Sequence, residues 1–254
     1  MKIFVTNLPW STDRKAHIQQ QLSGKGLDFE FVDCVIGKEL TEAEIGDRCD
    51  IDRIRELNKN EEWFNRGIIG CSLTSQNIHR TIVERNLETA MLMEDDVLLP
   101  DNFGQVIADC ERIIEPGDVI LLFWLSWETI RFKKESRIEL GTVTLYETPD
   151  LNKVSGGSAT IFSREAAANM LKFNTPIRLT PDCWGDFALA GCFNRVLCAY
   201  PTVVDTADFM STMEHGRFIP LRRAINRHRV FPFYQMLRYR RKKSKRGRQL
   251  AKID

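Results

Sequence analysis

Short apolar runs alternate with segments of helical character along most of the 254 residues. The apolar runs lie at residues 2–6, 29–32, 90–93, 119–124, 159–162 and 196–200. Segments that suit helices lie at about 11–22, 71–85, 101–114 and 164–172. Continuous apolar runs such as 119–124 and 159–162 are typical of central parallel strands, which are buried on both faces. The alternation therefore predicts an α/β, Rossmann-like fold, a mostly parallel sheet with helices on both faces.

Smaller signals refine this outline. Ser11 and Ser163 precede helical segments and are predicted to cap them, because serine hydroxyls accept hydrogen bonds from the first helical amides. Residues 39–66 are charged and irregular, and we expect only short helices there. In sheets of this kind, ligands bind beyond the carboxyl ends of the strands, so functional residues are sought there.

The net charge of +1 conceals a strong asymmetry. Residues 215–254 contain 14 Lys or Arg and one acid, Asp254, and the rest of the chain has 22 bases and 34 acids. We therefore predict a domain at 1–214 and a basic, aromatic-containing tail at 215–254. Residues 1–7 are typical of a strand rather than a signal peptide, and the longest apolar runs are too short to cross a bilayer. A cytoplasmic protein is expected.

Zinc and disulfide chemistry find no support in the sequence. The seven cysteines are odd in number and include no Cys-x-x-Cys pair, and the four histidines are scattered. Most cysteines are expected to be small buried core residues.

Three consecutive acids, Glu94, Asp95 and Asp96, directly follow the apolar run 90–93. Strand geometry would place Glu94 and Asp96 on the same side if the extended conformation continued. Carboxylates crowded in this way repel one another, and a divalent cation would relieve the repulsion. Their hard oxygen atoms suit Mg²⁺ or Mn²⁺, with a bound diphosphate completing the shell. The alternative is a solvated acidic loop that caps the next helix.

Five motifs in the same order resemble glycosyltransferase family 25, which includes bacterial lipooligosaccharide galactosyltransferases and collagen galactosyltransferases. The segment 67–74, Gly-Ile-Ile-Gly-Cys-Ser-Leu-Thr, followed by 90–97, resembles the family's Gly-x-Ile-Gly-Cys segment and its strand ending in Glu-Asp-Asp. The other matches are Val5 to Leu8 with Asp13-Arg14, Gly156 to Ala166, and Pro181-Asp182. The likeness runs from residue 3 to about residue 190. It departs from the family at Ile68, at Thr74-Ser75 in place of Ser-His, and at Thr160 in place of Tyr; His79 is a weak candidate to replace the lost imidazole.

The resemblance implies a glycosyltransferase A-type fold, a UDP-sugar donor and a Mn²⁺ or Mg²⁺ cofactor. It implies Asp96 as the direct metal ligand, with Glu94 and Asp95 contacting the metal, its waters or the donor. Asn7 and Arg14 are the candidates for the nucleotide side. The alternative is that Asn7 lies in an ordinary turn and Arg14 on the exposed side of a helix. Gly156 would let the backbone approach the donor, although a plain turn explains it equally well.

An inverting transfer needs a general base for the acceptor hydroxyl. Asp182 occupies the position of a family aspartate and is the first candidate; Asp186 is the second. The two lie four residues apart, one turn if the segment is helical. Trp184 is a candidate for stacking against a sugar. The alternative is that Asp182 caps the following helix.

Eight of the eleven residues at 238–248 are Lys or Arg, and aromatic residues occur through the rest of the tail. Such a segment suits an anionic membrane surface, which predicts peripheral attachment to the inner face of the cytoplasmic membrane. Nucleic-acid binding is not expected, because the acidic body would repel phosphate and no such motif occurs. A solvated, disordered tail is the remaining alternative.

The sequence thus favours galactosyl transfer from UDP-galactose, with inversion, to a lipooligosaccharide or related glycan. Two alternatives stay open. A metal-dependent phosphoesterase would use the same acids without a sugar acceptor, and a non-catalytic membrane- or nucleic-acid-binding protein would use the tail alone.

Overall fold

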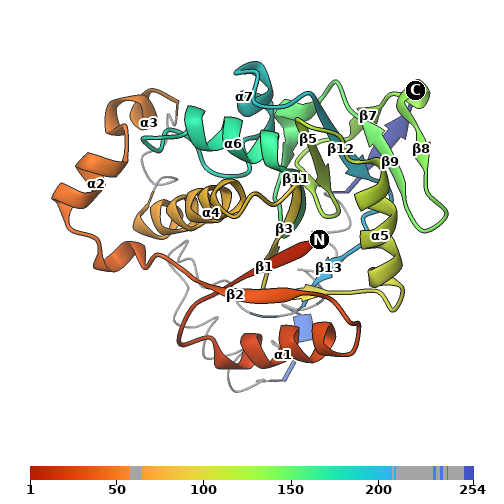
Figure 1. The fold of residues 1–254 in the computed structure, drawn as a ribbon, viewed down its shortest axis with the longest axis horizontal. Coiled ribbons are helices and arrows are strands. Elements are labelled where there is room, and N and C mark those ends of the chain that lie inside the picture. Colours follow the sequence, from red (N-terminus) through yellow and green to blue (C-terminus); the bar gives the residue numbers. More distant parts are fainter. Residues whose placement is uncertain (58–64, 208, 210–230, 233–234, 237–238, 240–248) are drawn as a thin grey trace.

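The structure is a computed structural model that describes residues 1–57, 65–207, 209, 231–232, 235–236, 239 and 249–254. Its centre is an eight-stranded sheet in the order β2-β1-β3-β11-β5-β12-β9-β8 (Figure 1). These strands are β1 (Lys2–Asn7), β2 (Phe29–Asp33), β3 (Thr89–Glu94), β5 (Asp118–Leu121), β8 (Ile138–Glu139), β9 (Thr144–Glu147), β11 (Ala159–Ser163) and β12 (Arg195–Ala199). Three short pairs join β4 (Val97–Leu98) to β13 (Asp205–Thr206), β6 (Leu125–Ser126) to β10 (Val154–Ser155), and β7 (Ile130–Phe132) to β14 (Ala251–Ile253).

Most strands of the central sheet run in the same direction, as predicted. The pairs β1–β2, β1–β3 and β5–β12 are parallel. The expectation that 159–162 forms a further parallel strand is wrong, because β11 runs antiparallel to both β3 and β5. A parallel neighbour needs a long crossover, usually a helix, whereas residues 122–158 form short strands and 3₁₀ turns, among them η3 (Lys134–Ser136) and η4 (Leu151–Lys153).

Helices cover both faces of the sheet. They are α1 (Thr12–Ser23), α2 (Glu42–Arg48), α3 (Ile51–Leu57), α4 (Arg66–Glu84), α5 (Phe103–Ile113), α6 (Arg164–Phe173) and α7 (Trp184–Leu189), with the 3₁₀ turn η1 (Gly37–Glu39). Side chains of β1 alternate between the faces: Ile3 and Val5 pack with α1 and α5, and Phe4 packs with α4 and α6. Figure 1 shows α4 and α6 side by side. The alternation thus divides the side chains of β1 between the cores on the two faces of the sheet.

The helix boundaries agree with the sequence in part. The hydroxyl of Ser163 accepts a hydrogen bond from the Ala166 amide, which confirms the predicted cap. The prediction for Ser11 is wrong: it stands at the N-cap position but its hydroxyl makes no cap hydrogen bond. Its backbone carbonyl instead accepts a hydrogen bond from Asn7 Nδ2 at 3.1 Å. Helix α4 begins at Arg66 rather than near residue 71, because the Asn65 side chain caps the amides of Gly67 and Ile68.

The end of the predicted basic tail returns to the body of the protein. Strand β14 pairs in parallel with β7, and Gln249 Nε2 lies 3.4 Å from the carbonyl oxygen of Trp124. Most of the tail, including the basic run 238–248 apart from Tyr239, falls outside the described residues. No helix within the described ranges is long and apolar enough to cross a membrane.

Candidate active site

The acid triplet lies at the carboxyl end of β3, between β1 and the start of β11. Glu94 is the last residue of the strand and is paired with Thr6 of β1. The extended conformation ends there, and Asp95 and Asp96 form a turn before β4. The condition for placing Glu94 and Asp96 on the same side, a continued extended conformation, is therefore not met, because this turn separates β3 from β4.

Asp95 is the buried member of the triplet, with 5% of its surface exposed. Its Oδ2 accepts a hydrogen bond from Asn7 Nδ2 at 2.7 Å, and its Oδ1 accepts one from Arg14 Nη1 at 2.5 Å. The end of β1, helix α1 and the end of β3 thus meet at one carboxylate. A buried charge of this kind is tolerated because a cation and a hydrogen-bond donor compensate it. Asn7 and Arg14 from one motif and Asp95 from another thus form one cluster.

Asp96 is more open, with 19% of its side chain exposed. Its Oδ2 accepts a hydrogen bond from Arg14 Nη2 at 3.1 Å. Its backbone carbonyl accepts a hydrogen bond from the Ala207 amide at 2.6 Å, so the segment that follows β13 lies against the turn. One guanidinium therefore joins two neighbouring carboxylates, and the second of these, Asp96, is partly exposed.

Glu94 faces a different neighbour, Ser158, which immediately precedes β11. The Ser158 hydroxyl donates to Glu94 Oε2 at 2.7 Å, and the Glu94 amide donates to the Ser158 carbonyl at 2.9 Å. Burial, followed by the negative charge of Asp96, raises the pKa of Glu94 to about 7. Two carboxylates whose like charges repel each other are suited to sharing a cation.

The donor set fits Mg²⁺ or Mn²⁺ as partial coordination. Glu94 and Asp96 offer hard oxygen atoms close enough to repel each other. Across the described residues, no three His, Cys, Asp or Glu side chains converge into a complete metal site. An ion held here would take the rest of its shell from water and a bound diphosphate, the usual arrangement for Mg²⁺ at phosphate sites.

A loop held by Asp182 lies beside Ser158. Gly156 has a φ of +79°, which suits glycine, and its amide donates to Asp182 Oδ2 at 3.0 Å. The Thr180 hydroxyl donates to Asp182 Oδ1 at 2.9 Å. Asp182 therefore positions the Gly156 loop and does not cap α7, whose N-cap residue is Cys183.

The comparison with known proteins decides the family. A model of glycosyltransferase family 25, described as an LPS biosynthesis protein, matches residues 1–183. The chain belongs to glycosyltransferase family 25. The matched region contains Asn7, Arg14, the acid triplet, Gly156 and Asp182, and it ends before Asp186.

Similar curated proteins are longer than this chain. Procollagen galactosyltransferase 1-B of Xenopus laevis is 32% identical over 101 residues, 38% of this chain and 16% of that protein. A glycosyltransferase 25 family member of Anopheles gambiae is 30% identical over 120 residues, 44% of this chain and 20% of that protein. The inactive glycosyltransferase 25 family member 3 of Mus musculus is 28% identical over 131 residues, 51% of this chain and 21% of that protein. The chain thus spans about a fifth or less of the length of these relatives.

One solved structure covers more of the chain at lower similarity. A glycosyltransferase involved in the glycosylation of the major capsid of PBCV-1 aligns with 83% of this chain and 93% of its own, at 13% identity and a TM-score of 0.40. That TM-score is too low to support an argument.

Two hypotheses about the acceptor side are corrected by the structure. Trp184 is buried with 2% exposure, packs near Phe162 and Phe193, and donates through Nε1 to the Gly156 carbonyl at 2.8 Å, so it offers no face to a sugar. Helix α7 begins at Trp184, so Asp182 precedes the helix while the exposed Asp186 lies within it. The condition for a spacing of one helical turn, that the whole segment from Asp182 to Asp186 be helical, is therefore not met.

Cys71 belongs to the family's Gly-x-Ile-Gly-Cys segment but was expected only as a core residue. It is exposed, while the residues at 68–70 and 72–76 of α4 are buried. Crowding of its thiol by surrounding protein atoms, followed by the negative charges of Glu94 and Asp182, raises the pKa of Cys71 to about 12. Cys71 thus lies at the side of the site that faces both acids.

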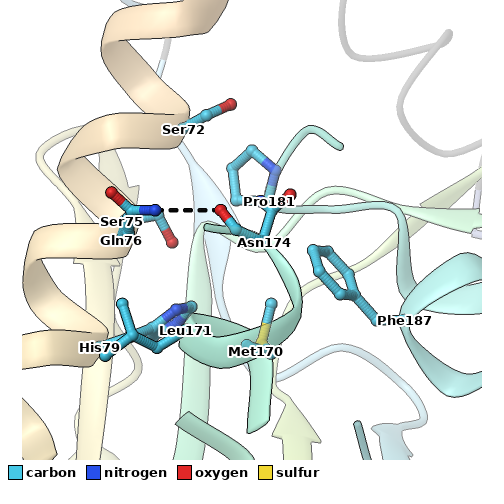
Figure 2. Close-up of a pocket in the computed structure, with 9 residues that line it drawn as sticks. All are labelled: Ser72, Ser75, Gln76, His79, Met170, Leu171, Asn174, Pro181 and Phe187. Atoms are coloured by element: carbon cyan, nitrogen blue, oxygen red, sulfur yellow. Dashed lines mark hydrogen bonds between the residues drawn. The ribbon is translucent and has the colours of Figure 1, made fainter. Parts of the chain in front are cut away.

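The three departures from the family pattern are buried rather than exposed in the site. Ile68 and Ser75 lie on α4, and the Thr160 hydroxyl donates to the Gly157 carbonyl at 3.1 Å. Figure 2 shows Ser75 with Ser72, Gln76 and His79 around a cavity of about 10 Å³, between α4 and α6. That volume suits about one water molecule.

His79 does not supply an imidazole to the acid triplet. Its ring packs edge-on against Phe162, with the ring centroids 4.8 Å apart, and burial lowers its pKa to about 4. It is a neutral core residue, two helical turns beyond Cys71.

Proposed function

We propose that this chain is a metal-dependent glycosyltransferase that moves a hexose, with inversion, from a nucleotide sugar to a glycan. The observation that carries the proposal is that Asn7 and Arg14 contact two acids of the triplet, Asp95 and Asp96, at one strand end inside the region that matches the family. Galactose and UDP-galactose are the first choice because relatives are named galactosyltransferases. Lipooligosaccharide or a related glycan is the acceptor suggested by the family's description.

The proposed donor site uses the more open acids for the metal and the buried cluster for positioning. Asp96 is the direct ligand of Mn²⁺ or Mg²⁺, and Glu94 is the second. When bound, the ion supplies neutralisation of charge on the departing diphosphate. Asp95 holds Asn7 and Arg14 at the nucleotide side, and the Gly156 loop closes the other side.

The proposed general base is Asp182. It accepts the proton of the acceptor hydroxyl as that oxygen bonds to the anomeric carbon, and the bond from that carbon to the diphosphate oxygen breaks. The electron pair of the broken bond leaves with the diphosphate. Asp182 and Glu94 both influence Cys71, which supports their facing a common space. Asp186 remains the second candidate and is exposed on α7.

The first experiment measures nucleotide release from a panel of UDP-sugars with Mn²⁺, Mg²⁺ or EDTA. Release from one sugar that requires the metal supports the proposal and identifies the donor. We expect Asp96→Ala to lower this release at least 100-fold without unfolding the protein, since it removes a direct charge contact. Asp101→Ala is the matched control, because Asp101 is an exposed acid five residues later.

Other outcomes identify the alternatives. Phosphate release without sugar transfer favours a phosphoesterase. Nucleotide and metal binding without turnover, with every donor and a panel of glycan acceptors, favours a non-catalytic protein, a distinction that matters because one relative is named inactive. A fully active, folded Asp96→Ala variant contradicts the assigned ligand.

The proposed location is the cytoplasm, peripheral to the inner face of the cytoplasmic membrane. The basic run at 238–248 supports this location, because it would be attracted to anionic lipids. Attachment to the membrane would bring the enzyme close to a lipid-linked acceptor.

A further inference from the structure

Arg14 brings a positive charge to two of the three acids of the site, Asp95 and Asp96. Only 11% of its side chain is exposed, and its two terminal nitrogens donate separately to Asp95 and Asp96. Its guanidinium carbon also lies 5.3 Å from the centre of the Phe209 ring. The planar guanidinium is thus fixed by two carboxylates and one aromatic face.

In this arrangement, Arg14 and a divalent cation would compete for Asp96. Both would draw on the negative charge of Asp96, and two cations beside one carboxylate repel each other. Asp95 is the poorer ligand, because it is buried and both of its oxygens already accept hydrogen bonds from Asn7 and Arg14. A metal ion arriving alone therefore meets acids that are already partly neutralised.

A nucleoside diphosphate removes this conflict. Its phosphate oxygens bring negative charge and accept guanidinium hydrogen bonds well. The two contacts use different nitrogens, so a pivot of the whole guanidinium about Nη1 can carry Nη2 from Asp96 to a phosphate while Nη1 stays on Asp95. Phe209 keeps the guanidinium near the site during this exchange.

We propose that Arg14 neutralises Asp96 in the metal-free protein, so that a divalent cation binds tightly only together with a nucleoside diphosphate, to which Arg14 then donates. The inference rests on the proposed function, since it takes Asp96 as a metal ligand and a diphosphate as part of the donor. It assigns Arg14 a positioning role and makes the two ligands mutually dependent.

The test measures Mn²⁺ affinity of the full chain by calorimetry, with and without UDP. For the wild type we expect Mn²⁺ to bind at least tenfold more tightly with UDP present. In Arg14→Gln, Mn²⁺ alone should bind about tenfold more tightly than to the wild type, and UDP should add less than threefold. Lys15→Gln is the matched control: it removes the same charge from the next residue of α1, where the Lys15 ammonium lies over Phe31, and should change neither value more than twofold.

The outcomes separate this inference from the proposed function. Equal Mn²⁺ affinity with and without UDP in the wild type overturns the role of Arg14, whatever the variants show. Unchanged or weaker Mn²⁺ binding in Arg14→Gln also overturns it, and a melting curve establishes that the variant is folded. If Arg14→Gln does not fold, Arg14→Lys, which keeps the charge but cannot join both acids, should reduce the effect of UDP at least threefold. UDP binding that EDTA leaves unchanged contradicts the metal-dependent function itself.

Discussion

At the scale of single residues, Asp182 holds a loop and is the proposed general base, and mutation can separate these two tasks. Its carboxylate holds the Gly156 amide and the Thr180 hydroxyl. Asparagine keeps one carbonyl oxygen for this purpose but cannot serve as a base at neutral pH. We expect Asp182→Asn to fold and to lower the turnover rate at least 100-fold, the usual contribution of a general base. Asp186→Asn is the control and should keep the rate within about threefold; equal losses would contradict the assignment of Asp182.

His79 predicts the pH dependence of stability. Burial lowers its pKa to about 4 in the folded protein, below the ordinary value of 6.5. The unfolded chain therefore binds the proton more tightly, and the stability due to neutral His79 is present above pH 6.5 and lost as the pH falls toward 4. We expect the difference in free energy of unfolding between wild type and His79→Phe to fall by about 3 kcal/mol over this range. Urea denaturation of both proteins at several pH values measures it, and a difference that stays constant with pH would contradict this role of His79.

At the scale of elements, the packing of α4 against the loop after β2 positions one wall of the site. Gly70 lies in α4, and a Cβ there would approach the Val35 carbonyl oxygen to 2.4 Å and the Gly37 nitrogen to 2.8 Å. The next residue is Cys71, beside Glu94 and Asp182. The close approach of the helix to this loop therefore fixes a residue at the site.

Gly70→Ala should separate α4 from that loop. We expect a loss of about 3 kcal/mol in stability, because the clash involves backbone atoms that cannot rotate away. Gly46→Ala provides the comparison: Gly46 is exposed in α2, an added Cβ meets nothing within 4 Å, and alanine should stabilise the helix by about 0.5–1 kcal/mol. Denaturant titrations of both variants measure the two effects, and a neutral Gly70→Ala would show that the contact is looser than described.

At the scale of the whole molecule, the basic run 238–248 is followed by a strand that belongs to the body. Strand β14 pairs with β7, whose Ile130 and Phe132 are fully buried. Deleting residues 238–254 would therefore remove both charge and structure. Replacing the eight basic residues of the run with Gln and Ser keeps β14 and changes charge alone.

We expect this neutralised variant to keep the wild-type melting temperature and to lose most of its binding to vesicles containing phosphatidylserine. Each basic residue near an anionic surface contributes about 1 kcal/mol, so eight substitutions should lower vesicle affinity at least 100-fold. Cosedimentation with anionic and neutral vesicles measures the effect. Deleting 249–254 is the counterpart and should lower the melting temperature while leaving the basic run intact; unchanged vesicle binding in the neutralised variant would contradict membrane attachment through it.

The sequence by itself determined the α/β class, the positions of the central strands and the residues around the acid triplet. These follow from local rules, since burial on both faces produces unbroken apolar runs and Ser163 caps the helix that it precedes. The start of α4 was placed too late because Gly67 and Gly70 weaken a local helix signal, whereas Asn65 and the packing at Val35 favour helix there.

Only the tertiary structure decided which functional residues meet. Arg14 joins Asp95 and Asp96 across more than 80 positions of sequence, and β11 enters the sheet antiparallel. Asp182 turns out to hold the Gly156 loop, and Trp184 supports that loop instead of a sugar. Such contacts depend on strand order and on side-chain direction at the sheet edge, which are set by the packing of distant segments rather than by the residues next to each site in the chain.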